Sequence, residues 1–373
     1  MKPPRRSGLA LLACAFVSAG PLVAVLCADV GTWTEFSGEV IRAADITLAR
    51  GTAAARLVRG NTEVSFSAAQ GAIAFDYQPA PFDFRGQALT CREASTALRT
   101  GGQHRFAGGP ATALFALGGY RGFTSYRSAW LNEYYRQQYS SLSGTPGLDA
   151  FRPAAPAGRD ASFGGRWEYI KGNAFAQLTA GYAQDRVAPG YEIDFAGLRR
   201  SPDTLATTSA ALAFENVLSP RVRSRAEVRV ADTSGRELRV GGEAEARAAL
   251  GEAWIARAQI GGAREQPAFS ARFAGLAIER ELGRSVSVYA EGRLYRDTGE
   301  IENALLFTSA APALRSQSVG VGLRHDGDRW SWRIVVARLH TDFAPTNLNT
   351  DFFRQLYRDR DWLTLQAALS ARF

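Results

Sequence analysis

Apolar and polar residues alternate with a period of two through most of this chain, from about residue 62 to its end. In the segment "VRSRAEVRVA", residues 222–231, valine, serine and alanine on one face alternate with arginine and glutamate on the other. Successive side chains of a β-strand point to opposite faces, whereas an amphipathic helix repeats every three or four residues. The pattern therefore predicts an all-β fold with about fourteen strands, each of roughly ten to thirteen residues.

The connections between these segments alternate in length as well. Tight turns such as "KGN" and "LSPR" alternate with a second set that contains every long insertion. Consecutive turns of an antiparallel sheet lie at opposite ends, so short turns gather at one end and long loops at the other. This asymmetry is typical of an antiparallel transmembrane β-barrel with short periplasmic turns and long external loops. We expect the external loops at residues 79–89, 122–160, 186–204, 297–313 and 342–360.

A soluble sandwich or solenoid would also alternate, and it is the main competing fold. One face of the expected strands carries many charges and must be solvated, so the apolar face needs an equally large partner. No helical region of the sequence supplies that partner, but lipid does. Since every backbone polar group in lipid must be paired, the sheet has to close. The expected barrel has about 14 strands, and 12 or 16 also fit the pattern.

The first residues differ from the rest in composition. A basic stub at Lys2, Arg5 and Arg6 precedes an apolar run, so residues 1–28 are expected to form a secretory signal peptide. Residues 29–61 form either a periplasmic segment or additional strands, and residues 62–373 form the barrel. Export leaves Cys91 as the one clearly mature cysteine, which excludes an internal disulfide framework.

The formal net charge of +8 raises the question of nucleic acid binding. Export argues against it, and the arginines are spread along strands instead of gathered in a tail, so no nucleic acid partner is expected.

The closing segment "DWLTLQAALSARF", residues 361–373, ends on a large apolar side chain. Leu365, Leu369 and Phe373 share one face of it, and an apolar chain end needs a partner. This segment resembles the C-terminal signature of Gram-negative outer-membrane β-barrel proteins, in which a terminal aromatic residue is read during assembly. The resemblance implies a porin-like protein of the outer membrane. It also implies contact with outer-membrane lipid and lipopolysaccharide and with the barrel assembly machinery.

The polar faces of the expected strands are the best indication of function. An arginine excess with interspersed glutamate would line a water-filled pore and favour anions. The alternative is an arginine–glutamate lattice that braces a closed barrel with a structural or surface-recognition role. Loop segments 128–142 and 350–362 either fold inward as a constriction or cover the mouth. The candidate lumen residues are Arg223, Arg225, Glu227, Arg229, Arg239, Glu243, Glu245, Arg247, Arg257, Glu291 and Arg293.

Four aromatic residues at strand ends next to short turns, Trp167, Tyr169, Trp330 and Trp332, are candidates for a periplasmic girdle. The plainer interpretation is the ordinary preference of aromatic residues for strands.

The sequence does not favour an enzyme. His104, His325 and His340 are the only histidines, and none is near an evident nucleophile in the sequence. An outer-membrane lipid-modifying enzyme is the least favoured alternative, with His340 as its first candidate base. No cofactor and no metal site are expected, and the oligomeric state is left open.

Overall fold

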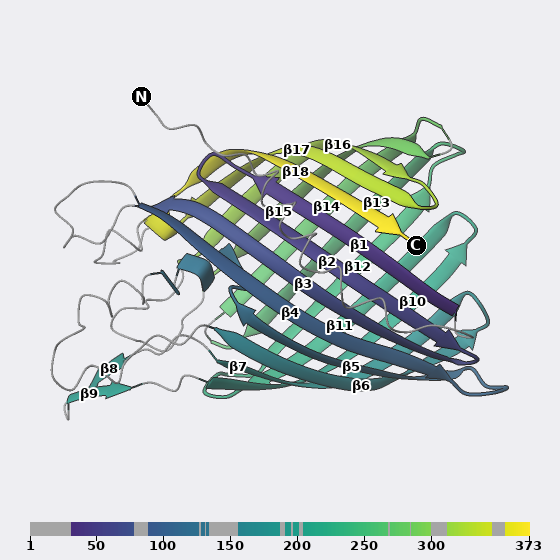
Figure 1. The fold of residues 1–373 in the computed structure, drawn as a ribbon, viewed down its shortest axis with the longest axis horizontal. Helices are drawn as coiled ribbons and strands as arrows, with labels where there is room; N and C mark the ends of the chain where they lie inside the picture. Colours follow the sequence, from purple (N-terminus) through teal and green to yellow (C-terminus); the bar gives the residue numbers. More distant parts are fainter. Residues whose placement is uncertain are drawn as a thin grey trace.

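A computed structural model describes residues 31–77, 89–126, 128–130, 132–133, 156–186, 191–194, 197–200, 204–267, 269–283, 285–299, 312–344 and 355–373. Within these residues the chain forms a single closed barrel of sixteen antiparallel strands (Figure 1). The predicted class, an antiparallel β-barrel, is confirmed. The predicted signal peptide at residues 1–28 lies outside the described residues.

Neighbouring strands in the sequence are neighbours in the sheet, apart from a small hairpin between β7 and β10. The hairpin consists of β8 (Tyr191–Asp194) and β9 (Gly197–Arg200). The barrel strands are β1 (Gly31–Arg42), β2 (Ile46–Arg59), β3 (Thr62–Tyr77), β4 (Leu89–Arg105), β5 (Ala111–Gly122), β6 (Ala157–Ile170), β7 (Ala174–Arg186), β10 (Thr204–Ser219), β11 (Val222–Thr233), β12 (Arg239–Ala249), β13 (Trp254–Glu265), β14 (Phe269–Glu281), β15 (Val286–Asp297), β16 (Leu314–Asp326), β17 (Trp330–Phe343) and β18 (Arg360–Arg372).

The expectation of about fourteen strands is wrong, and the alternative of sixteen is confirmed. Residues 31–59 supply the two additional strands, β1 and β2, and β18 closes the barrel against β1 instead of against the strand that begins at residue 62. The outward positions of β2 are mostly Ala, Gly and Thr, as in "TLARGTAAA", residues 47–55. Side chains this small give little contrast between the faces, which is why the alternation there is weak.

Two apparent breaks in the alternation are not bulges. The phase changes near Gly71 in β3 and near Gly275 in β14, yet both strands keep an unbroken register with both neighbours. In each case large apolar residues lie on the inward face and are covered by another group. Phe75 of β3 packs beneath a loop helix, and Phe273 of β14 lies beneath the guanidinium of Arg293.

The register assigns one face of every strand to the outside of the barrel and the other to its interior. Outward apolar side chains such as Phe163, Val319 and Leu363 are 70%, 67% and 71% exposed. A band of this kind is favourable only against lipid. Among the helices in the described residues, none has the length and apolar character needed to span a membrane.

Consecutive connections lie at opposite ends of the barrel, and most residues of the predicted external loops at 79–89, 122–160, 186–204, 297–313 and 342–360 lie outside the described residues. Figure 1 shows the C-terminus at the short-turn end and the hairpin β8–β9 at the opposite, long-loop end. Gly60 and Gly172 sit in the tight turns at φ of 57° and 76°. A side chain with a Cβ is strained at these φ values, so glycine permits a turn this short.

Phe373 completes the closure between β18 and β1. Its N–H donates to the carbonyl of Thr34 at 2.9 Å, and its carbonyl accepts from the Thr34 N–H at 3.1 Å. Its ring contacts those of Phe36 and Trp330, with centroids 6.3 and 6.4 Å apart. The residue that ends the chain therefore joins the first strand to β17 and β18.

Deletion of Phe373 is expected to lower the folded, heat-modifiable fraction by at least about threefold, because the last ladder pair and the ring contacts are lost together. Gel mobility of unheated outer-membrane extracts measures that fraction. Phe163→Ala is the matched control, since Phe163 has the same exposed fraction, 70%, but lies away from the closing pair. Equal assembly of the two variants would contradict a special role for Phe373.

Candidate functional site

The inward face of the wall formed by β11, β12 and β13 carries a dense set of charged side chains. The cross-strand register places these residues on the face opposite the outward apolar band. The set comprises Arg223, Arg225, Glu227, Arg229, Arg239, Glu243, Glu245, Arg247, Arg257 and Glu265. All but Glu265 were singled out from the sequence, and the other two candidates, Glu291 and Arg293, share the inward face of β15.

Ion pairs link part of this wall while leaving it open to solvent. Glu227 accepts from Arg225 at 2.9 Å and from Arg229 at 2.8 Å, and the two arginine side chains remain 53% and 64% exposed. Arg257 lies 4.0 Å from Glu245, with both side chains more than one third exposed. Pairs this exposed contribute little stability, at most about 1 kcal/mol each. They present charge to water instead of filling the interior.

Two arginines near the long-loop end, Arg239 of this set and Arg293 of β15, also contact aromatic rings. Arg239 pairs with Glu265 at 2.8 Å, and its guanidinium lies 4.6 Å above the ring of Phe269. Arg293 lies 5.3 Å above the ring of Phe273 in the same way. A guanidinium over an aromatic face keeps its charge while its position is fixed. Sequence reasoning missed Glu265 because only the register brings it opposite Arg239.

A cavity of about 340 Å³, lined by both charged and apolar side chains, spans β16, β17, β18, β1 and β2. Arg50, Arg324 and Arg333 line it together with Glu39 and Asp326. Arg324 is neutralised by Glu279 at 3.1 Å and by Asp326 at 2.7 Å, whereas among the described residues Arg50 and Arg333 have no ion-pair partner. None of the three was singled out from the sequence. The cross-strand pairing of Arg324 with Arg333 would have indicated the site, but it requires the register.

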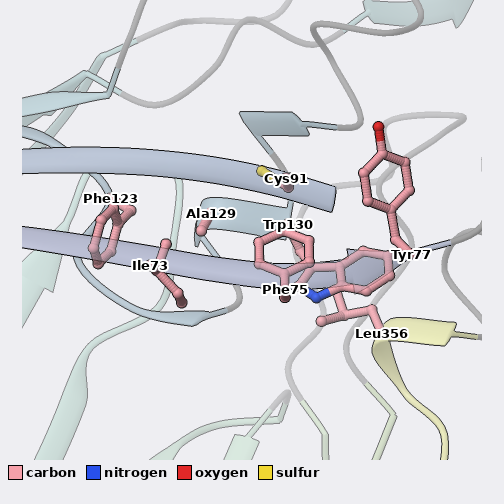
Figure 2. Close-up of a cluster of buried hydrophobic side chains, with 8 residues drawn as sticks. All are labelled: Ile73, Phe75, Tyr77, Cys91, Phe123, Ala129, Trp130 and Leu356. Carbon is pink, nitrogen blue, oxygen red and sulfur yellow. The ribbon is translucent and has the colours of Figure 1, made fainter. Parts of the chain in front are cut away.

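Apolar side chains gather at the long-loop end of β3 and β4, where a short helix from the β5–β6 connection packs against the wall (Figure 2). The mouth cluster, as we call it, consists of Ile73, Phe75, Tyr77, Cys91, Phe123, Ala129, Trp130 and Leu356. The sequence offered two roles for this connection, an inward constriction or a lid. Contact with inward-facing residues of β3 places the described part of the helix on the inner wall.

A serine cap and aromatic stacking define the helix. Ser125 and Ser128 cap its first turn reciprocally, each hydroxyl accepting from the backbone N–H of the other, at 3.1 and 2.9 Å. Trp130 is 1% exposed and stacks on Phe75 with centroids 5.0 Å apart and an interplanar angle of 14°. Tyr126 meets Phe75 edge-on at 5.5 Å. Residues 134–142 of the loop segment 128–142 lie outside the described residues.

A carboxylate fixes the other end of the described helix. Glu133 is 2% exposed and accepts from the Tyr77 hydroxyl at 2.5 Å and from the Cys91 thiol at 3.5 Å. Cys91, Glu93 and Glu133 place their ligand atoms within 4.8 Å of one another, the one such group among the described residues. Because hydrogen bonds already satisfy the Glu133 carboxylate, this arrangement is explained without a metal ion.

Arg360 joins the helix to the β17–β18 connection. It is 7% exposed and donates to the carbonyls of Gln355 and Leu356, at 2.6 and 2.8 Å, and to the Tyr126 hydroxyl at 3.3 Å. Its guanidinium also lies 5.0 Å from the ring of Trp362. These contacts of the two terminal nitrogens offset much of the cost of burying the cation, although Nε of Arg360 has no hydrogen-bond partner within the described residues. The segment 350–362, also proposed as a constriction, thus supports the helix in its described part.

The four predicted girdle residues face outward beside short turns. Trp167, Tyr169 and Trp330 are 54%, 45% and 51% exposed, and Trp332 stacks on His325 with centroids 5.8 Å apart. Trp254 of β13, which was not predicted, is 43% exposed beside another short turn.

The histidines do not form a catalytic arrangement among the described residues. His104 contacts the Thr62 hydroxyl at 2.8 Å near a short turn, and His325 stacks on Trp332. His340, the first candidate base, lies opposite Asp361 on the outward face. No hydrogen bond joins it to a hydroxyl or thiol in the described part of the chain, so a nucleophile–base pair is not formed there.

Comparison with known proteins supports the fold and is uninformative about sequence family. No protein-family model and no curated protein sequence matches this chain. CdiB from Acinetobacter baumannii is structurally similar with a TM-score of 0.57 and 8% identity, over 92% of this chain and 60% of CdiB. A bacterial polysaccharide outer membrane secretin matches with a TM-score of 0.50 and 8% identity, over 92% and 98%.

OprB of Pseudomonas putida has a TM-score of 0.49 and 8% identity, over 92% of each chain. Identities this low establish the fold alone. At the level of the fold, the chain is a closed antiparallel β-barrel. This likeness agrees with the barrel fold that the closing strand predicts.

Trp130→Ala is expected to release the helix from the wall. Removing a buried tryptophan costs about 3–5 kcal/mol, which exceeds what a single capped turn can recover. Limited proteolysis of the folded barrel should then cut the β5–β6 connection, and Trp167→Ala, which alters an exposed outward residue, should leave the cleavage rate unchanged. Equal protection of both variants would mean that Trp130 does not hold the helix.

The docked helix is also expected to depend on the protonation of Tyr126, which lies in the connection outside the strands. Burial raises the pKa of its phenol above the ordinary value, although the Arg360 guanidinium acts in the opposite direction. Docking therefore favours the neutral phenol. Its contribution is complete below the pKa of the undocked tyrosine, about 10, and is lost as pH rises through the higher docked value.

Tryptophan fluorescence of the folded barrel, followed as the pH is raised above about 10, should show this release. Tyr126→Phe lacks the titrating group and should keep the helix docked over the same range. Indistinguishable titrations of the two proteins would contradict a role for Tyr126 ionisation.

Proposed function

We propose that this protein is a porin-like channel that lets small polar solutes diffuse across the outer membrane, with a preference for anions. The observation that carries the proposal is the solvent exposure of inward-facing charges on β11–β13, shown by Arg225 and Arg229 at 53% and 64%. A barrel filled by its own side chains would bury and pair these groups. Exposed charge on an inner wall is what a water-filled lumen requires.

The proposed anion preference rests on the composition of the same wall. Its strands contribute six inward arginines and four inward glutamates: Arg223, Arg225, Arg229, Arg239, Arg247 and Arg257 against Glu227, Glu243, Glu245 and Glu265. Arg50 and Arg333 add two cations without ion-pair partners among the described residues. Carboxylates such as Glu35, Glu39 and Glu63 on β1 and β3 oppose this excess, so the expected preference is moderate.

Two walls of different character face each other across the lumen. In the closed order of sixteen strands, β3 and β13 are eight strands apart and therefore lie on opposite sides. The helix of the mouth cluster narrows the lumen at the β3 and β4 side, and the charged wall forms the other side. A solute that enters from the long-loop end passes between an aromatic surface and a row of guanidinium and carboxylate groups.

Conductance in planar lipid bilayers tests the proposal. Purified, heat-modifiable protein should open stable channels with an anion-selective reversal potential in a salt gradient. Channels that never open in correctly folded protein would favour the alternative, a closed barrel with a structural or surface-recognition role.

Reversing two charges tests whether the β11 wall lies along the conducting path. Arg225→Glu combined with Arg229→Glu should lower the anion-to-cation permeability ratio by roughly three- to tenfold, because the wall changes from net positive to net negative. Arg280→Glu is the control, since Arg280 faces outward over Trp254 at the short-turn end. An unchanged ratio in the double variant would place the conducting path away from β11.

A further inference from the structure

Three arginines form a row on the outward face of the barrel near its long-loop end. Arg272 of β14 lies directly opposite Arg296 of β15, and Arg296 lies directly opposite Arg315 of β16. All three are exposed. Neighbouring strands are about 4.8 Å apart, so the row spans about 10 Å across the barrel surface.

Without a bound ligand, repulsion among these three arginines lowers the stability of the barrel. Like charges directly opposite each other on adjacent strands are destabilising. No carboxylate among the described residues forms an ion pair with any of the three, and Asp342, which lies opposite Arg315 on β17, is not in ion-pair contact with it. Another outward arginine near this end, Arg338, is paired with Asp361.

The row lies at the edge of the outward apolar band. Toward the short-turn end, the next outward residues on β14 and β15 are Ala274 and Leu294, and Leu276, Ile278 and Val319 continue the band over these three strands. Leu294 and Val319 are 58% and 67% exposed. A ligand held by the guanidinium groups would therefore have an apolar surface directly beside its anionic part.

We propose that Arg272, Arg296 and Arg315 bind the phosphate groups of a phosphorylated glycolipid in the outer leaflet, with its acyl chains against the adjacent apolar band. Guanidinium groups bind phosphate through paired, charge-assisted hydrogen bonds, and neutralisation by phosphate removes the repulsion within the row. A free anion would satisfy the arginines but gains nothing from Leu294 and Val319. The proposal concerns the outer wall and is independent of whether the lumen conducts.

Binding of bisphosphorylated lipid A to the folded protein in detergent tests the proposal. The triple variant Arg272→Gln, Arg296→Gln and Arg315→Gln should bind roughly 100-fold more weakly than the wild type, and wild-type binding should weaken as salt is raised. Arg280→Gln is the matched control, because it removes an outward arginine from β14 at the opposite rim. Equal affinity of the triple variant and this control would overturn the proposal.

Two further measurements identify the ligand chemistry and guard against misfolding. Lipid A stripped of phosphate should bind weakly, and inorganic phosphate should compete only poorly. Full competition by inorganic phosphate would mean a free-anion site and would overturn the glycolipid assignment.

The single variant Arg296→Gln relieves both like-charge contacts. It should raise the thermal unfolding midpoint in lipid-free detergent and lower it relative to the wild type in saturating lipid A. A midpoint that moves in the same direction in both conditions would also count against the proposal.

Discussion

The pairing of β1 with β18 is the interaction on which the rest of the structure depends. An open sheet of this length would leave two rows of backbone N–H and C=O groups facing lipid, each costing several kcal/mol. Closure removes both edges and fixes the register around the barrel, and the register decides which side chains face the interior. The charged wall and the outward arginine row thus belong to one continuous sheet, and the cavity at β16–β18, β1 and β2 spans the seam itself.

The sequence predicts the class of fold well because lipid imposes a strict period of two on the strands. Leu365 and Leu369 could be assigned to one face of their strand, and Arg225 and Glu227 to the polar face of theirs, from the alternation alone. The prediction of strict alternation fails where inward side chains contact other protein groups instead of water. Phe75 and Phe273 face inward, one beneath a helix and the other beneath a guanidinium, and each interrupts the apolar–polar alternation of its strand.

The candidate site was harder to predict than the fold, since its residues come together across strands. Arg324 and Arg333 adjoin only through the register of β16 with β17, and Arg50 lies in a strand whose small outward residues hid its alternation. The contact of Trp130 with Phe75 links a loop to a strand more than fifty residues away. Alternation within one strand carries no information on such pairs, so only individual wall positions could be assigned.

The mouth cluster joins both sides of the closing seam. Phe75 and Cys91 belong to strands on the β1 side, whereas Leu356 and Arg360 precede or begin β18 on the other side, and Arg358 pairs with Asp45 in the β1–β2 turn at 2.5 Å. The complete set of contacts exists only after β1 and β18 have met. The contacts of Arg360 with Tyr126 and of Arg358 with Asp45 therefore distinguish a finished barrel from one whose strands are formed but whose seam is still open.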